Sequence, residues 1–203
     1  VGGYIRNFSA VERSGFMVQN FTGRFSVDKG VIDLTDFEVM ARNSDVRLRS
    51  LKLSGDGWNS YKDFIHNVTI EGELHRTAIS TDDIAYFAPR LLPWHLAVRD
   101  ANVFVKGTVA DMSVDVDNIT FGQNSTLDCE VALRGLPNVK RAGMSVNLQN
   151  LTTDEQDMNM LLSSITGKSL PLQVRSIANS AGEIILAGEF SGSLQAFDTN
   201  LNM

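Results

Sequence analysis

The sequence has few cysteines, few prolines and no excess of basic residues. Its one cysteine among 203 residues cannot form an intrachain disulfide, which argues against a small disulfide-stapled secreted domain. Eighteen basic residues against 24 acidic ones give a net charge of -6. No cluster of Lys and Arg in the sequence forms the basic stripe that a nucleic-acid backbone would need, so we expect no nucleic-acid partner.

Long apolar runs are absent as well. No stretch approaches the roughly 20 apolar residues of a membrane-spanning helix, and the first residues lack the features of a signal peptide. Any targeting or anchoring segment is therefore expected outside the sequence given. With 43% hydrophobic and 21% charged residues, the chain has the composition of a soluble folded protein.

The motifs of the common catalytic and metal sites are also missing. His66, His75 and His95 show no ligand spacing, and no cysteine pair supplements them. Gly167-Lys168-Ser169 lacks the upstream glycine of a phosphate-binding loop. No Gly-x-Ser-x-Gly motif of the serine hydrolases occurs.

Acidic pairs have simpler explanations than catalysis. Asp82 and Asp83 are expected to cap a helix, and Asp115 and Asp117 alternate with valines, which places them on the polar face of a strand. The sequence thus predicts a protein that is not an enzyme, with no catalytic residue, metal site, cofactor or small-molecule substrate.

What the sequence does contain is apolar residues that alternate with polar ones, which is typical of strands with one apolar face. The alternating sets are Val103 and Val105; Val114 and Val116; Leu127, Cys129, Val131 and Leu133; Val146 and Leu148; and Thr199, Leu201 and Met203. Cys129 is expected to be a small buried apolar group.

Glycine-containing segments separate these strands and are typical of hairpin turns. They are Asp28-Lys29-Gly30, Ser54-Gly55-Asp56-Gly57 and Phe121-Gly122-Gln123-Asn124. Together with the alternation, they predict a mainly β protein built from an antiparallel meander, with two short helices.

Several strands change phase across a polar pair. The segments are Leu34-Thr35-Asp36-Phe37, Leu48-Arg49-Ser50-Leu51, Val116-Asp117-Asn118-Ile119 and Leu148-Gln149-Asn150-Leu151. A three-residue step turns the next apolar side chain to the opposite face unless the strand carries a bulge. We therefore expect bulges at these places and a curved, elongated sheet that forms a groove.

Two segments have helical spacing, at 79–88 and 152–165. In the first, Ser80 stands three residues before Asp83, and in the second, Thr153 stands three residues before Gln156, which predicts capping boxes. We expect these helices to cap or fill the groove.

An internal repeat accompanies the helices. Val68–Asp82 resembles Val146–Asp154, and Val103–Val109 resembles Ile185–Phe190, which indicates a loose repeat that extends along an axis. The predicted organisation is a β meander over 1–75, a first repeat over 76–150 and a second, truncated repeat over 151–203, or else one continuous domain.

The segment Ile79–Pro89, the strand ending Val105-Lys106-Gly107-Thr108-Val109 and the phrase Arg134-Gly135-Leu136-Pro137-Asn138 resemble the TamB and AsmA-like proteins of Gram-negative bacteria, in particular Bacteroidetes members. The resemblance implies a segment of a long periplasmic protein anchored in the inner membrane. It also implies an apolar β groove that guides phospholipid between membranes or supports an outer-membrane assembly partner.

The predicted lipid-facing residues are Val103, Val105, Leu127, Val131, Leu133, Val146 and Leu148. Alternation alone leaves open whether they line a groove or a closed core. A closed core would favour a protein-interaction scaffold. A third alternative is a carbohydrate-binding or adhesive module, for which Trp58 and Tyr61 would have to be exposed, although the spacing of Trp58, Tyr61 and Phe64 favours packing within a helical turn.

Overall fold

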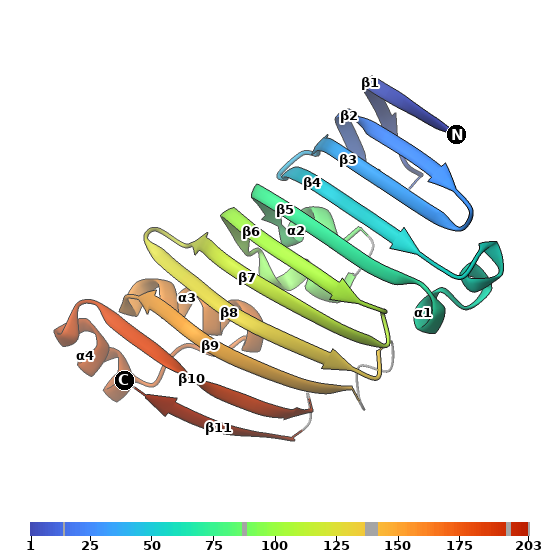
Figure 1. Ribbon diagram of the computed structural model, residues 1–203. Helices are drawn as coiled ribbons and strands as arrows, with labels where there is room; N and C mark the ends of the chain where they lie inside the picture. The colour runs from blue at the N-terminus through green and yellow to red at the C-terminus, as the bar shows by residue number, and fades with distance from the viewer. Residues whose placement is uncertain (14, 87–88, 137–141, 194–195, 203) are drawn as a thin grey trace.

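The computed structural model describes residues 1–13, 15–86, 89–136, 142–193 and 196–202. Its alternating segments form one open sheet of eleven strands in the order of the chain (Figure 1). The strands are β1 (Gly2–Val11), β2 (Met17–Asp28), β3 (Val31–Met40), β4 (Asp45–Ser54), β5 (Thr69–Ser80), β6 (Ala97–Gly107), β7 (Asp111–Phe121), β8 (Ser125–Arg134), β9 (Gly143–Thr153), β10 (Ile184–Ser193) and β11 (Ala196–Asn202). Every neighbouring pair is antiparallel.

The helices are short and lie in the connections between strands. They are the 3-10 helices η1 (Trp58–Asp63) and η2 (Pro89–Trp94) and the α-helices α1 (Phe64–Asn67), α2 (Thr81–Ile84), α3 (Glu155–Thr166) and α4 (Leu172–Ala181). The predicted fold class, mainly β with a few short helices, is confirmed, with 58% of residues in strands. The number of helices differs from the two expected, because the described residues form four α-helices.

Two of the three predicted hairpin turns are confirmed. Lys29-Gly30 joins β2 to β3, and Gly122-Gln123-Asn124 joins β7 to β8. The third segment, Ser54–Gly57, leads instead from β4 into η1. The bend there is held by a neighbouring turn, since the N–H of Gly55 donates to the carbonyl of Gly30 at 3.1 Å.

Bulges occur at all four predicted places. The register shifts beside Asp36 in β3, at Arg49 in β4, at Asn118 in β7 and at Gln149 in β9. Asp36 and Asn118 both have a φ of 54°, the left-handed conformation that Asn and Asp tolerate better than most residues.

Three more strands carry a residue with left-handed φ that the sequence pattern did not reveal. These residues are Asn7 in β1, Arg76 in β5 and Asp100 in β6, with φ between 46° and 52°. In β5 the polar pair is followed by Thr77 in place of an apolar residue, and in β6 it is followed by the small residue Ala101, so neither segment was identified as a phase change.

The two longer helical insertions leave the sheet at the same end. α2 and η2 connect β5 to β6, and α3 and α4 connect β9 to β10, four strands further along (Figure 1). α3 also contacts η2. The structure therefore has a repeat of four strands and one helical insertion, in which β5 corresponds to β9 and β6 to β10.

The helix starts differ in part from the predicted capping boxes. Ser80 is the N-cap of α2, as expected, and its side chain accepts a hydrogen bond from the N–H of Asp82. The N-cap of α3 is Asp154, which accepts from the N–H of Asp157, so the predicted cap at Thr153 is wrong by one residue. Thr153 is the last residue of β9 and is 4% exposed. The first predicted helix, 79–88, corresponds to α2, which covers only Thr81–Ile84; residues 87 and 88 lie outside the described part of the chain.

The sheet is open and has a large surface. The chain exposes 12731 Å², whereas a compact protein of 22.3 kDa exposes about 9,400 Å². Eleven apolar residues are buried among those that the structure describes. The predicted boundaries at 75/76 and 150/151 fall inside β5 and β9, where the sheet is continuous.

The bulge at Asn118 generates a test of the backbone. We expect Asn118→Val to lower the free energy of unfolding by about 1–2 kcal/mol, because a β-branched side chain is strained at positive φ. Thr120→Val, two residues further along the same strand, should change it by less than about 0.5 kcal/mol. Urea denaturation of both variants measures the difference, and equal effects would contradict a left-handed residue at 118.

Candidate functional site

One face of the sheet is lined by rows of apolar side chains that run across the strands. Row one contains Val27, Ile32, Leu53, Ile70, Gly107, Met112, Leu133 and Met144. Row two contains Phe25, Leu34, Leu51, Gly72, Val105, Val114, Val131 and Val146. Row three contains Phe37, Leu48, Leu74, Val103, Val116, Cys129 and Leu148.

All seven predicted lipid-facing residues lie on this face. Leu133 is in row one; Val105, Val131 and Val146 are in row two; Val103 and Leu148 are in row three; and Leu127 lies beyond the bulge, paired with Ile119 and Leu151. The structure extends the face beyond the predicted set, because row two begins in β2 and crosses eight strands. The pairing register between neighbouring strands brings the residues of each row together, and this register was not predicted from the sequence.

Burial differs between the rows. Phe37, Val116, Cys129 and Leu148 of row three are 5–8% exposed. Every apolar side chain of rows one and two is instead only partly buried. Each touches neighbours in its own sheet, but no second sheet lies over these rows in the part of the chain that the structure describes. Rows one and two therefore form an open apolar face.

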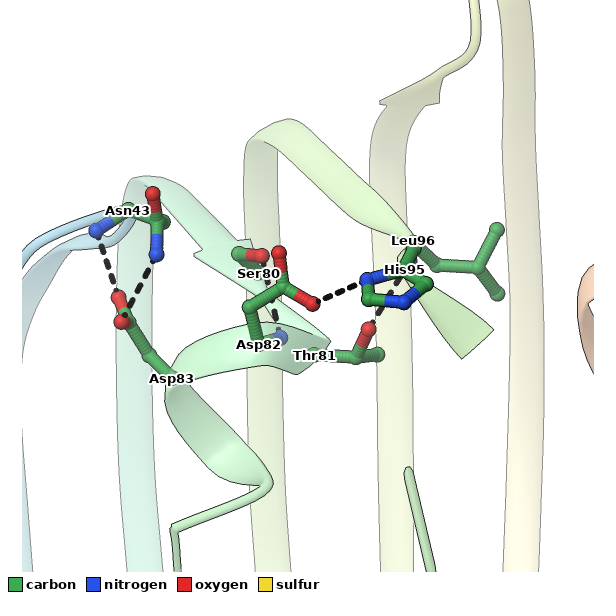
Figure 2. Close-up of polar contacts among 7 residues, drawn as sticks. All are labelled: Asn43, Ser80, Thr81, Asp82, Asp83, His95 and Leu96. Carbon is green, nitrogen blue, oxygen red and sulfur yellow. Dashed lines mark hydrogen bonds and ion pairs between the residues drawn. The ribbon is translucent and has the colours of Figure 1, made fainter. Parts of the chain in front are cut away.

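The helical insertions are held at the end of the sheet away from row one by two buried aspartates. Asp83 of α2, 4% exposed, accepts hydrogen bonds from the backbone N–H and the side-chain amide of Asn43, at 2.8 and 3.2 Å (Figure 2). Asn43 lies in the turn between β3 and β4. Sequence analysis gave Asp83 a role in capping alone and missed this contact.

Asp157 holds α3 in the same way. Its carboxylate accepts hydrogen bonds from the backbone N–H groups of Gln123, Asn124 and Ser125, at 3.0–3.2 Å, and from the Ser125 hydroxyl at 2.7 Å. These residues form the turn between β7 and β8 and the start of β8. Asp83 and Asp157 each stand three residues after the N-cap of their helix. The two copies of the repeat therefore attach their helices to a turn of the sheet through the same kind of contact.

The environment of Asp157 shifts its pKa. Burial by itself raises the pKa, but hydrogen bonds from the Ser125 hydroxyl and from the N–H groups of Gln123, Asn124 and Ser125 outweigh it and hold the pKa below the ordinary value for Asp. The carboxylate is consequently charged in the folded protein at neutral pH.

Around α2 the remaining polar groups also bind one another. The Asp82 carboxylate lies 2.8 Å from Nδ1 of His95, and the Thr81 hydroxyl accepts a hydrogen bond from the N–H of Leu96 at 2.9 Å (Figure 2). His66 contacts Asp63 and His75 contacts Asn102, so the three histidines lie apart. Among the described residues no group of three or more His, Cys, Asp and Glu could hold a metal ion.

Cys129 is buried, as predicted, at 6% exposure. Burial raises the pKa of its thiol, and the nearby charges of Asp115 and Asp128 raise it further. The thiol is therefore protonated at neutral pH and packs in row three as an apolar group.

The aromatic group forms a helical turn, as favoured by its spacing. Trp58 and Tyr61 belong to η1, and their ring centroids are 5.4 Å apart. The Tyr61 hydroxyl lies 3.1 Å from the carbonyls of both Gly30 and Leu53, and Phe64 packs on the Tyr61 ring. Trp58 is 51% exposed, so one ring of the group faces solvent.

No family model, no curated protein and no solved structure matches this chain. In the part of the chain that the structure describes, no helix has the length and apolar character needed to cross a membrane.

Asp157 generates a pH-dependent prediction. Because its pKa is lowered by folding, its stabilising contribution is present above the unfolded pKa of about 3.9 and is lost as the pH falls through the lower, folded value. We expect Asp157→Asn to lower the free energy of unfolding by about 2–3 kcal/mol at pH 7, with a smaller loss at acidic pH. Urea denaturation at several pH values measures this.

Glu183→Gln is the matched control, because Glu183 is exposed and loses the same charge. It should shift stability by less than about 0.5 kcal/mol at every pH. A loss for Asp157→Asn that does not depend on pH would contradict the buried carboxylate.

Gly122 generates a second test of the same contact. A Cβ at this position would lie 2.1 Å from an oxygen of Asp157, on a backbone with φ of 58°. Gly122→Ala should therefore cost more than the about 1–2 kcal/mol of left-handed strain alone. Gly167→Ala, with φ of 70° and no atom within 4 Å of the added carbon, measures that strain by itself, and equal losses in urea denaturation would argue against the clash.

Proposed function

We propose that this chain is a non-catalytic lipid-binding module whose open apolar face lies against the acyl chains of phospholipid. The observation that carries the proposal is the incomplete burial of rows one and two: sixteen positions on eight strands present partly buried apolar side chains or glycine, and no second sheet lies over them among the described residues. A contiguous exposed apolar surface on a folded protein typically marks a binding surface.

The dimensions of the face suit an acyl chain. Neighbouring strands lie about 4.8 Å apart, so eight strands extend for about 34 Å, and one leaflet of a bilayer core is about 15 Å thick. An acyl chain can thus lie along row two with apolar contacts over its whole length. Each methylene removed from water contributes about 0.8 kcal/mol, which makes such contacts worth several kcal/mol per chain.

The charge distribution is consistent with this orientation. Residues that alternate with rows one and two, such as Glu71, Lys106, Asp115 and Glu130, lie on the opposite face of the sheet. The apolar face itself presents no charge in rows one and two. It is suited to hydrocarbon, and charged headgroups would have to lie at its margin.

The resemblance to TamB and AsmA-like proteins suggests a cellular location and a role for such a module. In that setting the chain is a periplasmic segment of a longer protein anchored in the inner membrane, and it guides phospholipid between membranes or supports an outer-membrane assembly protein. The internal repeat of four strands and a helical insertion supports it, because such repeats can lengthen a groove.

The alternatives are favoured by narrower observations. A closed-core scaffold is hard to reconcile with the large exposed area, and a protein-interaction role would need a sheet edge that pairs with a strand of the partner. A carbohydrate-binding role would rest on the exposed Trp58 ring and predicts glycan binding that is lost in Trp58→Ala.

Lipid that copurifies with the protein tests the proposal. The chain, directed to a bacterial periplasm and purified without detergent, should carry phospholipid detectable by native mass spectrometry. Leu133→Asp should lose most of that lipid, because it places a charge in row one. Ala132→Asp, one residue earlier and facing the other side of β8, should retain it.

Circular dichroism and melting temperature establish that both variants fold. Lipid retained equally by the two variants, or a folded wild-type protein that carries none, would refute binding at this face.

A further inference from the structure

Two methionines lie close together on the open apolar face. Met112 of β7 and Met144 of β9 are both register partners of Leu133 in β8, so the three side chains form one continuous stretch of row one. Neighbouring strands are about 4.8 Å apart, which places the two methionines about 10 Å from each other. A single acyl chain that lies along row one therefore contacts both of them.

Glycine leaves each methionine without a side-chain neighbour on its outer side. Met112 pairs with Gly107 of β6, and Met144 pairs with Gly192 of β10. Met112 and Met144 are only partly buried, and no second sheet lies over them in the part of the chain that the structure describes. Both side chains are therefore accessible to small solutes when no lipid covers the face.

The rest of the open face resists oxidation. Among the described residues of rows one and two, the other side chains belong to Val, Leu, Ile and Phe. Cys129 of row three is 6% exposed, and burial raises the pKa of its thiol, whereas the thiolate is the form that reacts with oxidants. The thioether of methionine needs no deprotonation, so Met112 and Met144 are the oxidisable groups of this face.

Hydrogen peroxide converts methionine to its sulfoxide without a further reactant. The sulfur lone pair attacks one peroxide oxygen, the O–O bond breaks, and proton transfer to the departing oxygen releases water. Sulfur loses two electrons and the peroxide gains them. The product carries a polar S=O group on a side chain that was apolar. Such a group is costly beside hydrocarbon when it has no hydrogen-bond partner, and here two of them would lie under one acyl chain.

We propose that Met112 and Met144 form a redox-sensitive element of the apolar face, at which peroxide converts both side chains to sulfoxides and so weakens the binding of phospholipid. This inference rests on the proposed lipid binding by the same face. The effect is reciprocal, because bound lipid covers the two thioethers and slows their oxidation. Enzymatic reduction of the sulfoxides restores the apolar row.

Uptake of fluorescent phosphatidylcholine from vesicles tests this. Wild-type protein treated with hydrogen peroxide should take up at least fivefold less lipid than untreated protein, and methionine sulfoxide reductase should restore the uptake. Met112→Leu with Met144→Leu keeps the size and apolar character of the row and should take up lipid equally before and after peroxide. The control, Met17→Leu with Met40→Leu, removes methionines that are 37% and 44% exposed but lie outside rows one and two. It should lose uptake as the wild type does.

Peptide mass spectrometry supplies a readout that needs no variant. Preincubation of the wild-type protein with phosphatidylcholine vesicles should slow sulfoxide formation at Met112 and Met144 at least threefold and leave it unchanged at Met17 and Met40. Untreated wild-type protein that takes up no lipid would refute the lipid-binding function and this inference together. If lipid is taken up but peroxide does not reduce the uptake, if the Met112→Leu with Met144→Leu variant loses as much, or if the vesicles leave all sulfoxide rates equal, the redox element alone is overturned.

Discussion

The extra residue that successive strands carry near their middle is the constraint on which the rest of the structure depends. Strands of ten to twelve residues keep one apolar face only if side chains alternate throughout, and a three-residue step between apolar positions would turn half of them away. The bulges at Asp36 and Asn118 absorb that step. Because neighbouring strands share it, register is maintained across the sheet and the apolar rows remain continuous.

The position of the helices decides which part of the apolar face stays open. Rows one and two stay open because α2 and α3 are attached elsewhere, at the turns that Asp83 and Asp157 reach. Asp83 accepts one backbone N–H and the side-chain amide of Asn43, and Asp157 accepts three backbone N–H groups at the turn between β7 and β8. α2 and α3 therefore lie at one end of the sheet, whereas η1 and α1 lie at the other end, beside β4 and β5 (Figure 1). The apolar side chains of rows one and two are left for a ligand, a partner or water to cover.

Much of the fold could be predicted from local pattern. Alternation identified β6, β7, β8, β9 and β11, Cys129 as an apolar group and the phase changes at four bulges, since each depends on residues close in sequence. The roles of Asp83 and Asp157 could not be predicted, because their partners lie 40 and 32–34 residues away. Thr153 and Asp154 are both residue types that favour an N-cap. Asp154 is the cap because the Thr153 hydroxyl is hydrogen-bonded with the Ser125 hydroxyl at 2.8 Å. For the candidate site, alternation identified the face but not its openness, which depends on the absence of a covering layer.

The central claim, an apolar face open to solvent, is tested most directly by solvent paramagnetic relaxation of methyl groups in lipid-free protein labelled at valine and leucine. A soluble gadolinium chelate should broaden the methyl signals of Val131 and Leu133 strongly, while those of Val116 and Leu148, which are 7–8% exposed, stay sharp. If all four residues are equally protected, the rows are covered in solution and the chain has a closed core.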